Sequence, residues 1–442
     1  MTDSSPETRE THQFLHAIPY NQAIPYLTHH LWEKSKLGLE RTRDLLASLG
    51  NPERKLRFIH IAGTNGKGST AAMLASILKE AGFRAGLTTS PYIHYFNERI
   101  QINGSSISGE DLERITQRVR IVAGSMADHP SVFELITAIA FLYFLEMRCD
   151  IVVLEVGMGG RLDSTNVIGT PEVAVITTIG LDHTRELGDT VEKIAAEKAG
   201  IIKPNGVVVC YPQVDSVKQV IREKCREENA SLSFVDSGLI HPIAQTLDGQ
   251  QFDYGEMEGL TIPLLGEHQL INAAVAMESI GALRTRGWTI TERAVREGLR
   301  KTVWPGRFEV MRRSPVFVVD GAHNPQGVQA AVKSLGLLFP GRKASFLIGI
   351  LRDKNYEEMV ELLIPYATRF VTVTPNSRRA LPADELAACI QRYAVEAIAC
   401  ESVQHGVERA LLLSSSDDVI CALGSLYMVG EIRGCLQALD GH

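Results

Sequence analysis

The sequence predicts an α/β protein with two domains, and three observations lead to this fold class. The chain has 442 residues, more than one hydrophobic core usually holds. Runs of β-branched residues, typical of parallel strands, alternate with helical patterns along most of it. A Pro-Gly break in "KTVWPGRFEV" (301–310) separates two such regions. We therefore expect a larger α/β domain over residues 1–300, a linker over 301–306 and a smaller Rossmann-like α/β domain over 307–442.

The first domain is expected to start with a strand, a glycine-rich turn and a helix, after a polar and loosely ordered N-terminus. The strand is "RFIHIA" (57–62), and the helix is "STAAMLASILKEAG" (69–82), which ends at its glycine. A polar segment at 236–262 predicts hairpins or loops. The other expected elements are strands at 149–157 and 172–180 and helices at 131–147, 190–200 and 267–286.

The second domain repeats the alternation on a smaller scale. Four segments predict its strands, with helical patterns between them: "PVFVVDGAHNPQG", "ASFLIGIL", "RFVTVTP" and "DDVICALGS". No internal repeat interrupts this pattern.

Composition indicates a cytoplasmic enzyme that acts on small molecules. The net charge is −7, with basic and acidic residues mixed, which argues against a nucleic-acid partner. The seven cysteines show no C-x-x-C spacing and are expected to be free thiols in a reducing compartment. We see neither a signal peptide nor a membrane-spanning run, and we take a monomer as the working expectation.

A glycine-rich loop between the first strand and helix predicts a phosphate site. Its glycines let backbone N–H groups approach phosphate oxygens, the helix offers its positive end, and Lys67 adds a mobile charge. The spelling departs from the common G-x-x-x-x-G-K-[ST] loop, because Ile61 holds the first glycine's place and Gly68 separates the lysine from the serine. The alternative is a turn without a ligand. We expect a P-loop-type nucleotide-binding domain, with ATP contacted by Gly63, Thr64, Asn65, Gly66, Lys67, Gly68 and Ser69.

The loop "GTNGKGS" resembles that of the Mur ligase superfamily, in particular its folylpolyglutamate synthase and dihydrofolate synthase branch. Further blocks follow in the order of that family across nearly the whole chain. They are "TTSPYIHYFNERIQING", "LEVGMGGRLDSTNVI", "TTIGLDHTRELGDTVEKIAAEKAGIIKP", "GEHQLINAAVA", "WPGRFEV", "DGAHNPQG" and "GSLYMVGEIR".

The resemblance implies that Ser90, Glu155 and His183 hold Mg²⁺, which prefers few hard ligands and lets phosphate and water complete its shell. Considered without the family, Glu155 could be a buried carboxylate neutralised by a base, and His183 a helix-capping or core histidine. The resemblance also implies that Lys198 is carbamylated (N6-carboxylysine). The ordinary alternative for Lys198 is a cation that complements the end of its helix.

In the second half, Asn272, Arg307 and Asp320 match the family's ATP-contacting positions. Arg307 could clamp phosphate and neutralise charge on the transferred group. His323 lies in the same "DGAHN" turn and could position the reacting groups, while Asn324 would cap the next helix before a proline. The expected catalytic set is Lys67, Lys198, Arg307, Asp320 and His323.

The resemblance places the pterin substrate near two segments. Phe133 could stack on a flat pterin and Asp163 could accept hydrogen bonds from its N–H groups. Without the family, Phe133 would be a helix core residue. The full expected set is Ser131, Phe133, Glu134, Leu162, Asp163 and Ser164.

These expectations together describe an ATP- and Mg²⁺-dependent ligase that adds L-glutamate to dihydropteroate and to reduced folates through an acyl phosphate. The alternatives within the class are an enzyme that performs only one of the two reactions and another Mur-type ligase. A ligase of peptidoglycan precursors is disfavoured, because only about 55 residues precede the loop, too few for the extra domain that such enzymes carry. From a different class, a P-loop ATPase that couples hydrolysis to partner binding stays open.

Overall fold

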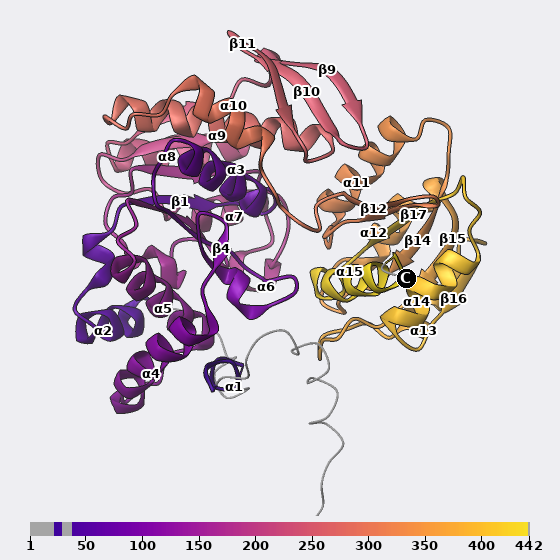
Figure 1. The fold of residues 1–442 in the computed structure, drawn as a ribbon, viewed down its shortest axis with the longest axis horizontal. Helices are drawn as coiled ribbons and strands as arrows, with labels where there is room; N and C mark the ends of the chain where they lie inside the picture. The colour runs from indigo at the N-terminus through magenta and orange to yellow at the C-terminus, as the bar shows by residue number, and fades with distance from the viewer. Residues whose placement is uncertain (1–21, 29–37, 441–442) are drawn as a thin grey trace, which may run out of the picture.

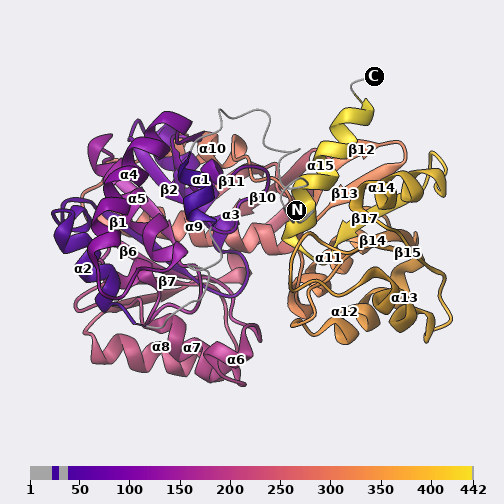
Figure 2. The ribbon, with the colours of Figure 1, turned by 90° about the horizontal axis from the view of Figure 1, so that it is seen from below.

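The computed structural model describes residues 22–28 and 38–440. The N-terminus expected to be loosely ordered lies outside these residues for almost all of its length. Figure 1 shows two α/β bodies side by side, the first drawn from indigo to pink and the second from orange to yellow. Figure 2 shows the same separation from below. The predicted fold class is confirmed.

An eight-stranded sheet with the order β4-β3-β2-β5-β1-β6-β7-β8 forms the centre of the first body. The central strand β1 pairs in parallel with β5 and β6, and every residue of these three strands is buried. Burial on both faces explains their unbroken apolar runs. The bounds are β1 Phe58–Ala62, β2 Ala85–Thr88, β3 Ile100–Ile102, β4 Ser105–Ser106, β5 Ile151–Glu155, β6 Val173–Ile176, β7 Val207–Cys210 and β8 Ser231–Phe234.

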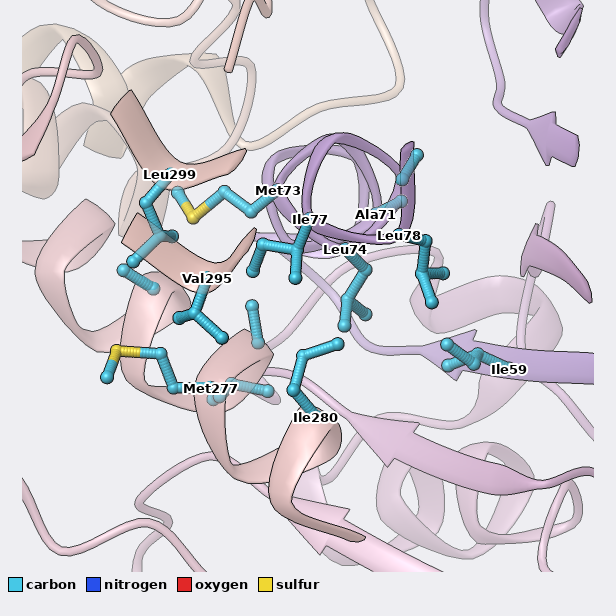
Figure 3. Close-up of a cluster of buried hydrophobic side chains, with 14 of the residues drawn as sticks. Ile59, Ala71, Met73, Leu74, Ile77, Leu78, Met277, Ile280, Val295 and Leu299 are labelled. Atoms are coloured by element: carbon cyan, nitrogen blue, oxygen red, sulfur yellow. The ribbon is translucent and has the colours of Figure 1, made fainter. Parts of the chain in front are cut away.

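Helices cover both faces of this sheet. Ile59 and Ile61 of β1 pack against α3, α9 and α10, whereas Phe58 faces α4 and α5 on the opposite side. Figure 3 shows the first of these clusters, in which side chains of α3 meet those of α9 and α10. The bounds are α1 Ala23–Leu27, α2 Glu40–Ser48, α3 Lys67–Glu80, α4 Gly109–Ser125, α5 Val132–Glu146, α6 Thr184–Leu187, α7 Val191–Ala199, α8 Asp215–Glu227, α9 Glu267–Thr285 and α10 Glu292–Arg300.

The polar segment at 236–262 forms an antiparallel sheet of three strands, as its turn residues predicted. The strands are β9 Ile240–Thr246, β10 Gly249–Tyr254 and β11 Met257–Ile262. Phe252 and Leu260 join the cluster of α9 and α10. This small sheet therefore belongs to the first body.

The second body contains a six-stranded sheet with the order β12-β13-β17-β14-β15-β16. Only β12 runs antiparallel to its neighbour. The edge strands β12 and β16 are not among the expected strands. The strand β12 is charged and half-buried, and β16 is only three residues long. The bounds are β12 Glu309–Arg313, β13 Val316–Val319, β14 Ala344–Ile348, β15 Ala367–Thr372, β16 Ala397–Ala399, β17 Val419–Leu423, α11 Pro325–Leu338, α12 Tyr356–Leu363, α13 Ala383–Gln391, α14 Val403–Leu412 and α15 Leu426–Asp440.

All seven cysteines are free thiols. Over the described part of the chain, no helix combines the length and apolar character needed to cross a membrane.

Candidate active site

The glycine-rich loop connects β1 to α3, as predicted. Gly66 is the residue before α3 and has a φ of 84°, a conformation that favours glycine. A Cβ at Gly66 would lie 2.6 Å from Asn272 Oδ1, and one at Gly63 would collide with Thr177 Oγ1. The loop thus lies against neighbouring elements too closely for larger residues, with the N-terminus of α3 next to it.

Two lysines converge on this loop. Lys67 Nζ donates to the carbonyl oxygens of Gly63 (3.0 Å) and Thr64 (3.2 Å), and Lys198 Nζ donates to Gly63 O (2.8 Å). Lys198 is only 4% exposed. Burial, with help from the charge of Lys67, lowers the pKa of Lys198 to about 7. Lys198 therefore points into the site and does not serve as an exposed cation at the end of α7.

The three expected magnesium ligands lie around one cavity of about 520 Å³. Glu155 is buried at the end of β5, and its Oε2 accepts a hydrogen bond from Ser90 N at 3.1 Å. Burial raises the pKa of Glu155, although Lys67 and Arg307 counteract this. His183 precedes α6 with a φ of 50°. Desolvation in the cleft lowers its pKa, which leaves the imidazole nitrogen free to act as a ligand.

This donor set fits Mg²⁺ shared with phosphate oxygens. A hydroxyl, one carboxylate and one imidazole are too few to enclose the ion, and Mg²⁺ commonly keeps water and substrate phosphate in its shell. Among the described residues, no group of three or more His, Cys, Asp or Glu is placed to hold a metal ion by itself.

The same cavity brings together every residue expected to contact ATP. It is lined by all seven loop residues from Gly63 to Ser69 and, from elsewhere, by Lys198, Asn272, Arg307, Asp320 and His323. Residues of the second body therefore form part of the wall of this cavity. Asn272 is 2% exposed and donates to Gln269 Oε1 at 3.0 Å.

The carboxylate of Asp320 holds its own turn in place. Its oxygens accept from Phe308 N at 2.6 Å and Ala322 N at 2.8 Å. Each oxygen keeps one lone pair for a ligand. In the same turn, His323 Nδ1 donates to Gly321 O at 2.8 Å, and its Nε2 lies 3.6 Å from Asp182 Oδ2. The predicted cap is confirmed, because Asn324 accepts from Gly327 N at 2.8 Å.

Two residues that the sequence reasoning passed over join the bodies at this site. Asp182 Oδ1 accepts from Lys354 Nζ at 2.5 Å, and Asp182 Oδ2 accepts from Asn324 at 3.1 Å. Burial alone would raise the pKa of Asp182, but hydrogen bonding to His323 and the charge of Lys354 hold it far below its usual range. The only sequence signal for Asp182 is its place in "LDH", directly before His183.

A second cavity of about 410 Å³ adjoins the first. Ser90, His183 and His323 line both. The second cavity is lined by all six residues expected to contact the pterin substrate, namely Ser131, Phe133, Glu134, Leu162, Asp163 and Ser164.

Hydrogen bonds divide these six residues into two kinds. Glu134 is committed to the chain, because it accepts from Ser131 N (2.6 Å) and pairs with Arg41 (3.2 Å). Asp163 accepts from Met158 N (2.9 Å) through Oδ2 and from both Thr165 N (3.0 Å) and Thr165 Oγ1 (2.5 Å) through Oδ1, one bond more than Asp320 accepts. Both carboxylates therefore shape the cavity through their own backbone contacts.

Phe133, in contrast, presents its ring to the second cavity. It is only partly buried, and a Cβ at Gly157 would lie 2.5 Å from ring atom Cζ. Ser164 Oγ is paired with Thr137 Oγ1 at 2.8 Å. Of the six residues, Phe133 offers the flat apolar surface that a planar ligand needs.

Comparison with protein families gives two matches that cover both bodies. Residues 61–280 match the Mur ligase middle domain, and residues 306–426 match the Mur ligase, glutamate ligase domain.

Named relatives match over almost the full chain. The dihydrofolate synthase/folylpolyglutamate synthase of Bacillus subtilis is 37% identical, over 91% of this chain and 95% of its own. The folylpolyglutamate synthase of Lacticaseibacillus casei is 35% identical, over 94% and 98%. The Escherichia coli dihydrofolate synthase/folylpolyglutamate synthase is 29% identical, over 96% of each.

Solved structures agree with these relatives. Mycobacterium tuberculosis folylpolyglutamate synthase complexed with ADP superposes with a TM-score of 0.86 at 32% identity, over 94% of this chain and 99% of that one. E. coli FolC in complex with DHPP and ADP gives 0.84 at 28% identity, over 94% and 97%. With both of its bodies matched and its loop, lysines and adjoining cavities in place, the chain belongs to the folylpolyglutamate synthase/dihydrofolate synthase branch of the Mur ligase family.

Proposed function

We propose that this protein is an ATP- and Mg²⁺-dependent ligase that joins L-glutamate to dihydropteroate and to tetrahydrofolate. The observation that carries the proposal is the meeting of two cavities at Ser90 and His183. One holds the glycine-rich loop, and the other presents the Phe133 ring. A substrate carboxylate at their junction would lie next to the terminal phosphate of ATP.

The chain's groups would act mainly by position and charge. The acceptor carboxylate attacks the terminal phosphoryl group, and the resulting acyl phosphate is attacked by the amino group of L-glutamate, which expels phosphate. Loop N–H groups, Lys67 and Arg307 would neutralise the charge that develops on the phosphoryl oxygens. Ser90, Glu155 and His183 would hold Mg²⁺, which shields phosphate charge when it is bound.

Lys198 is proposed to carry a carbamate. Reaction with CO₂ needs a neutral amine, and a pKa of about 7 supplies a large neutral fraction at physiological pH. The carbamate would replace a cation by an anion close to the magnesium ligands. That change suits a site that binds a divalent metal ion.

The pterin is proposed to stack on Phe133. Asp163 and Glu134 would support the walls around it through the backbone bonds described above, and Asp320 and Asn272 would contact the nucleotide. We further propose a cytoplasmic monomer with its interdomain linker at 301–306, where the chain passes between the two bodies.

Product analysis tests this function. Purified protein with ATP, Mg²⁺ and L-glutamate is expected to give a product heavier by one glutamyl residue from dihydropteroate and from tetrahydrofolate, as resolved by mass. If only one of the two acceptors gains a glutamyl residue, the enzyme performs that reaction alone. Phosphate release that needs neither glutamate nor acceptor would indicate the ATPase.

A loop variant serves as a second test. Lys67→Ala removes the mobile charge but no core packing, so turnover is expected to fall by about two to three orders of magnitude in a folded protein. Circular dichroism and product formation are measured on the same sample. Near-normal turnover would contradict the assignment of the loop.

A further inference from the structure

Arg99 is a positively charged residue to which the proposed reaction assigns no role. It ends a short 3-10 helix (Phe96–Arg99) and lines the cavity that Phe133 faces. Its guanidinium carbon lies 5.2 Å from the ring centroid of Tyr92 and 5.6 Å from that of Phe96. These two rings hold the side chain at a fixed position in the cavity wall.

Within the described part of the chain, the guanidinium of Arg99 has no carboxylate partner. Its Nε is buried and makes no hydrogen bond. Burial lowers the pKa of Arg99, and the nearby charge of Glu155 offsets part of this effect without forming a salt bridge. A buried guanidinium without a salt-bridge partner is costly, and a ligand carboxylate would offset that cost.

The other basic side chains of this cavity are already paired. Four arginines and lysines line it: Arg99, Arg161, Lys354 and Arg379. Arg161 pairs with Glu197, Lys354 with Asp182, and Arg379 with Asp353. Arg99 is therefore the one fixed cation among them that is available to an anionic ligand.

The position of Arg99 decides which carboxylate it could bind. Arg99 lines the second cavity but does not line the nucleotide cavity, whereas its neighbours Ser90 and Pro91 line both. A carboxylate under activation must lie at the junction, next to the phosphate. A carboxylate on Arg99 is therefore one that does not react.

The two acceptors differ in this respect. Dihydropteroate has a single carboxylate, the one that reacts. A folate ends in glutamate, which brings one carboxylate to be activated and keeps a second one. We propose that Arg99 binds the non-reacting carboxylate of a glutamyl acceptor and so supports polyglutamate extension but not dihydrofolate synthesis. This inference rests on the proposed function of the same site.

Three acceptors test the role of Arg99: dihydropteroate, tetrahydrofolate, and the tetrahydrofolate analogue whose α-carboxylate is an α-carboxamide. Loss of a charge-assisted hydrogen bond is expected to cost about 10- to 100-fold in kcat/KM. The wild type should show that loss with the carboxamide. Arg99→Met should show it with tetrahydrofolate, lose nothing further with the carboxamide, and keep kcat/KM for dihydropteroate within about threefold of the wild type.

A binding measurement separates this inference from the proposed function. Calorimetric titration without ATP or glutamate is expected to show that the wild type binds tetrahydrofolate more tightly than tetrahydropteroate, and that Arg99→Met removes the difference. If the wild type adds glutamate but Arg99→Met loses equally on all acceptors, or raises only the KM for L-glutamate, Arg99 does not act in this way. If the wild type adds no glutamate to any acceptor, the proposed function is wrong, and the role of Arg99 that rests on it is wrong as well.

Two further variants control for structure. Arg161→Met removes another arginine from the same cavity, and the charge of Arg161 is already paired with Glu197. In this variant the ratio of activity on tetrahydrofolate to activity on dihydropteroate should not change. Arg99→Lys keeps the charge but loses the planar fork, so it should restore part of the preference. If Arg99→Met does not fold, Arg99→Lys is measured in its place. A ratio of activity on tetrahydrofolate to activity on dihydropteroate equal to that of the wild type would then overturn the proposal.

Discussion

Lys198 is the residue whose protonation depends most directly on its position in the fold. Its pKa falls from an ordinary 10.5 to about 7. Below pH 7 the amine is charged in both the folded and the unfolded chain, so the full cost of burying the charge is present. Between pH 7 and about 10.5 the unfolded chain binds a proton that the folded chain has released, so stability rises with pH.

Lys198→Met removes this effect. In CO₂-free buffer, the variant is expected to be more stable than the wild type at pH 6, and its advantage should shrink by about 1 to 3 kcal/mol at pH 9. Urea unfolding at the two pH values measures the change. An equal difference at both would show that the Lys198 charge is not buried.

The carbamate on Lys198 has its own test. Protein equilibrated with ¹³C-bicarbonate is expected to show one carbamate carbon resonance, stronger at pH 8 than at pH 6, because the neutral amine fraction rises through pH 7. Lys198→Ala should lose both the resonance and most activity, with part of the activity restored by short carboxylates. Active wild type without the resonance would rule the carbamate out.

Motifs predicted which residues meet at the site better than they predicted what each side chain does. All of the expected nucleotide and substrate residues line the two adjoining cavities. Yet both carboxylate oxygens of Asp163, which we expected to bind the pterin, accept hydrogen bonds from Met158 N and Thr165 N. Lys354 and Asp182 lie 172 positions apart, and their pairing depends on how two bodies dock, which no local pattern encodes.

The packing of α3 against α10 links the nucleotide loop to the small sheet. Gly298 of α10 lies against the backbone of Ile77 in α3, and an added Cβ would collide with it. Gly298→Ala is therefore expected to push the helices apart and to destabilise the protein by about 1 to 3 kcal/mol. Because α3 carries the loop, ATP affinity should fall as well. Denaturant unfolding and nucleotide titration measure the two effects.

Gly281 of α9 provides the matched control, since nothing lies within 4 Å of the place where its Cβ would be. Gly281→Ala should stabilise the helix by up to about 1 kcal/mol and leave ATP binding unchanged. Similar losses in both variants would mean that the contact with Ile77 is unimportant.

Elements with strong local patterns were predicted well, and elements defined by their neighbours were not. The buried runs of β1, β5 and β6 and the helix α9 are confirmed within a few residues. The strand β16 was not predicted, because its three residues form a strand only by pairing with β15. The charged strand β12 carries a pattern of exposure that a loop would share.

Across the whole molecule, polar contacts from one body to the other surround the catalytic cleft. Asn65 of the nucleotide loop donates to Gln326 Oε1 at 2.8 Å, and Gln326 donates to Thr178 Oγ1 at 3.1 Å. The pair of Lys354 and Asp182 lies beside them, with each side chain less than 10% exposed. The arrangement of the two bodies therefore depends on groups that touch the loop itself.

Lys354→Met would leave the Asp182 carboxylate desolvated without its cation, which is expected to disfavour the closed arrangement by about 3 kcal/mol. The bodies should separate so that Asp182 regains water, and glutamate incorporation should fall because water enters the site. Small-angle scattering is expected to show a larger radius of gyration while the melting temperature of each body changes little. Lys333 and Glu267 form an exposed pair across the same boundary, and such pairs contribute little. Lys333→Met should therefore leave the radius unchanged, and an equal response of both variants would mean that burial of the Lys354 pair does not hold the cleft closed.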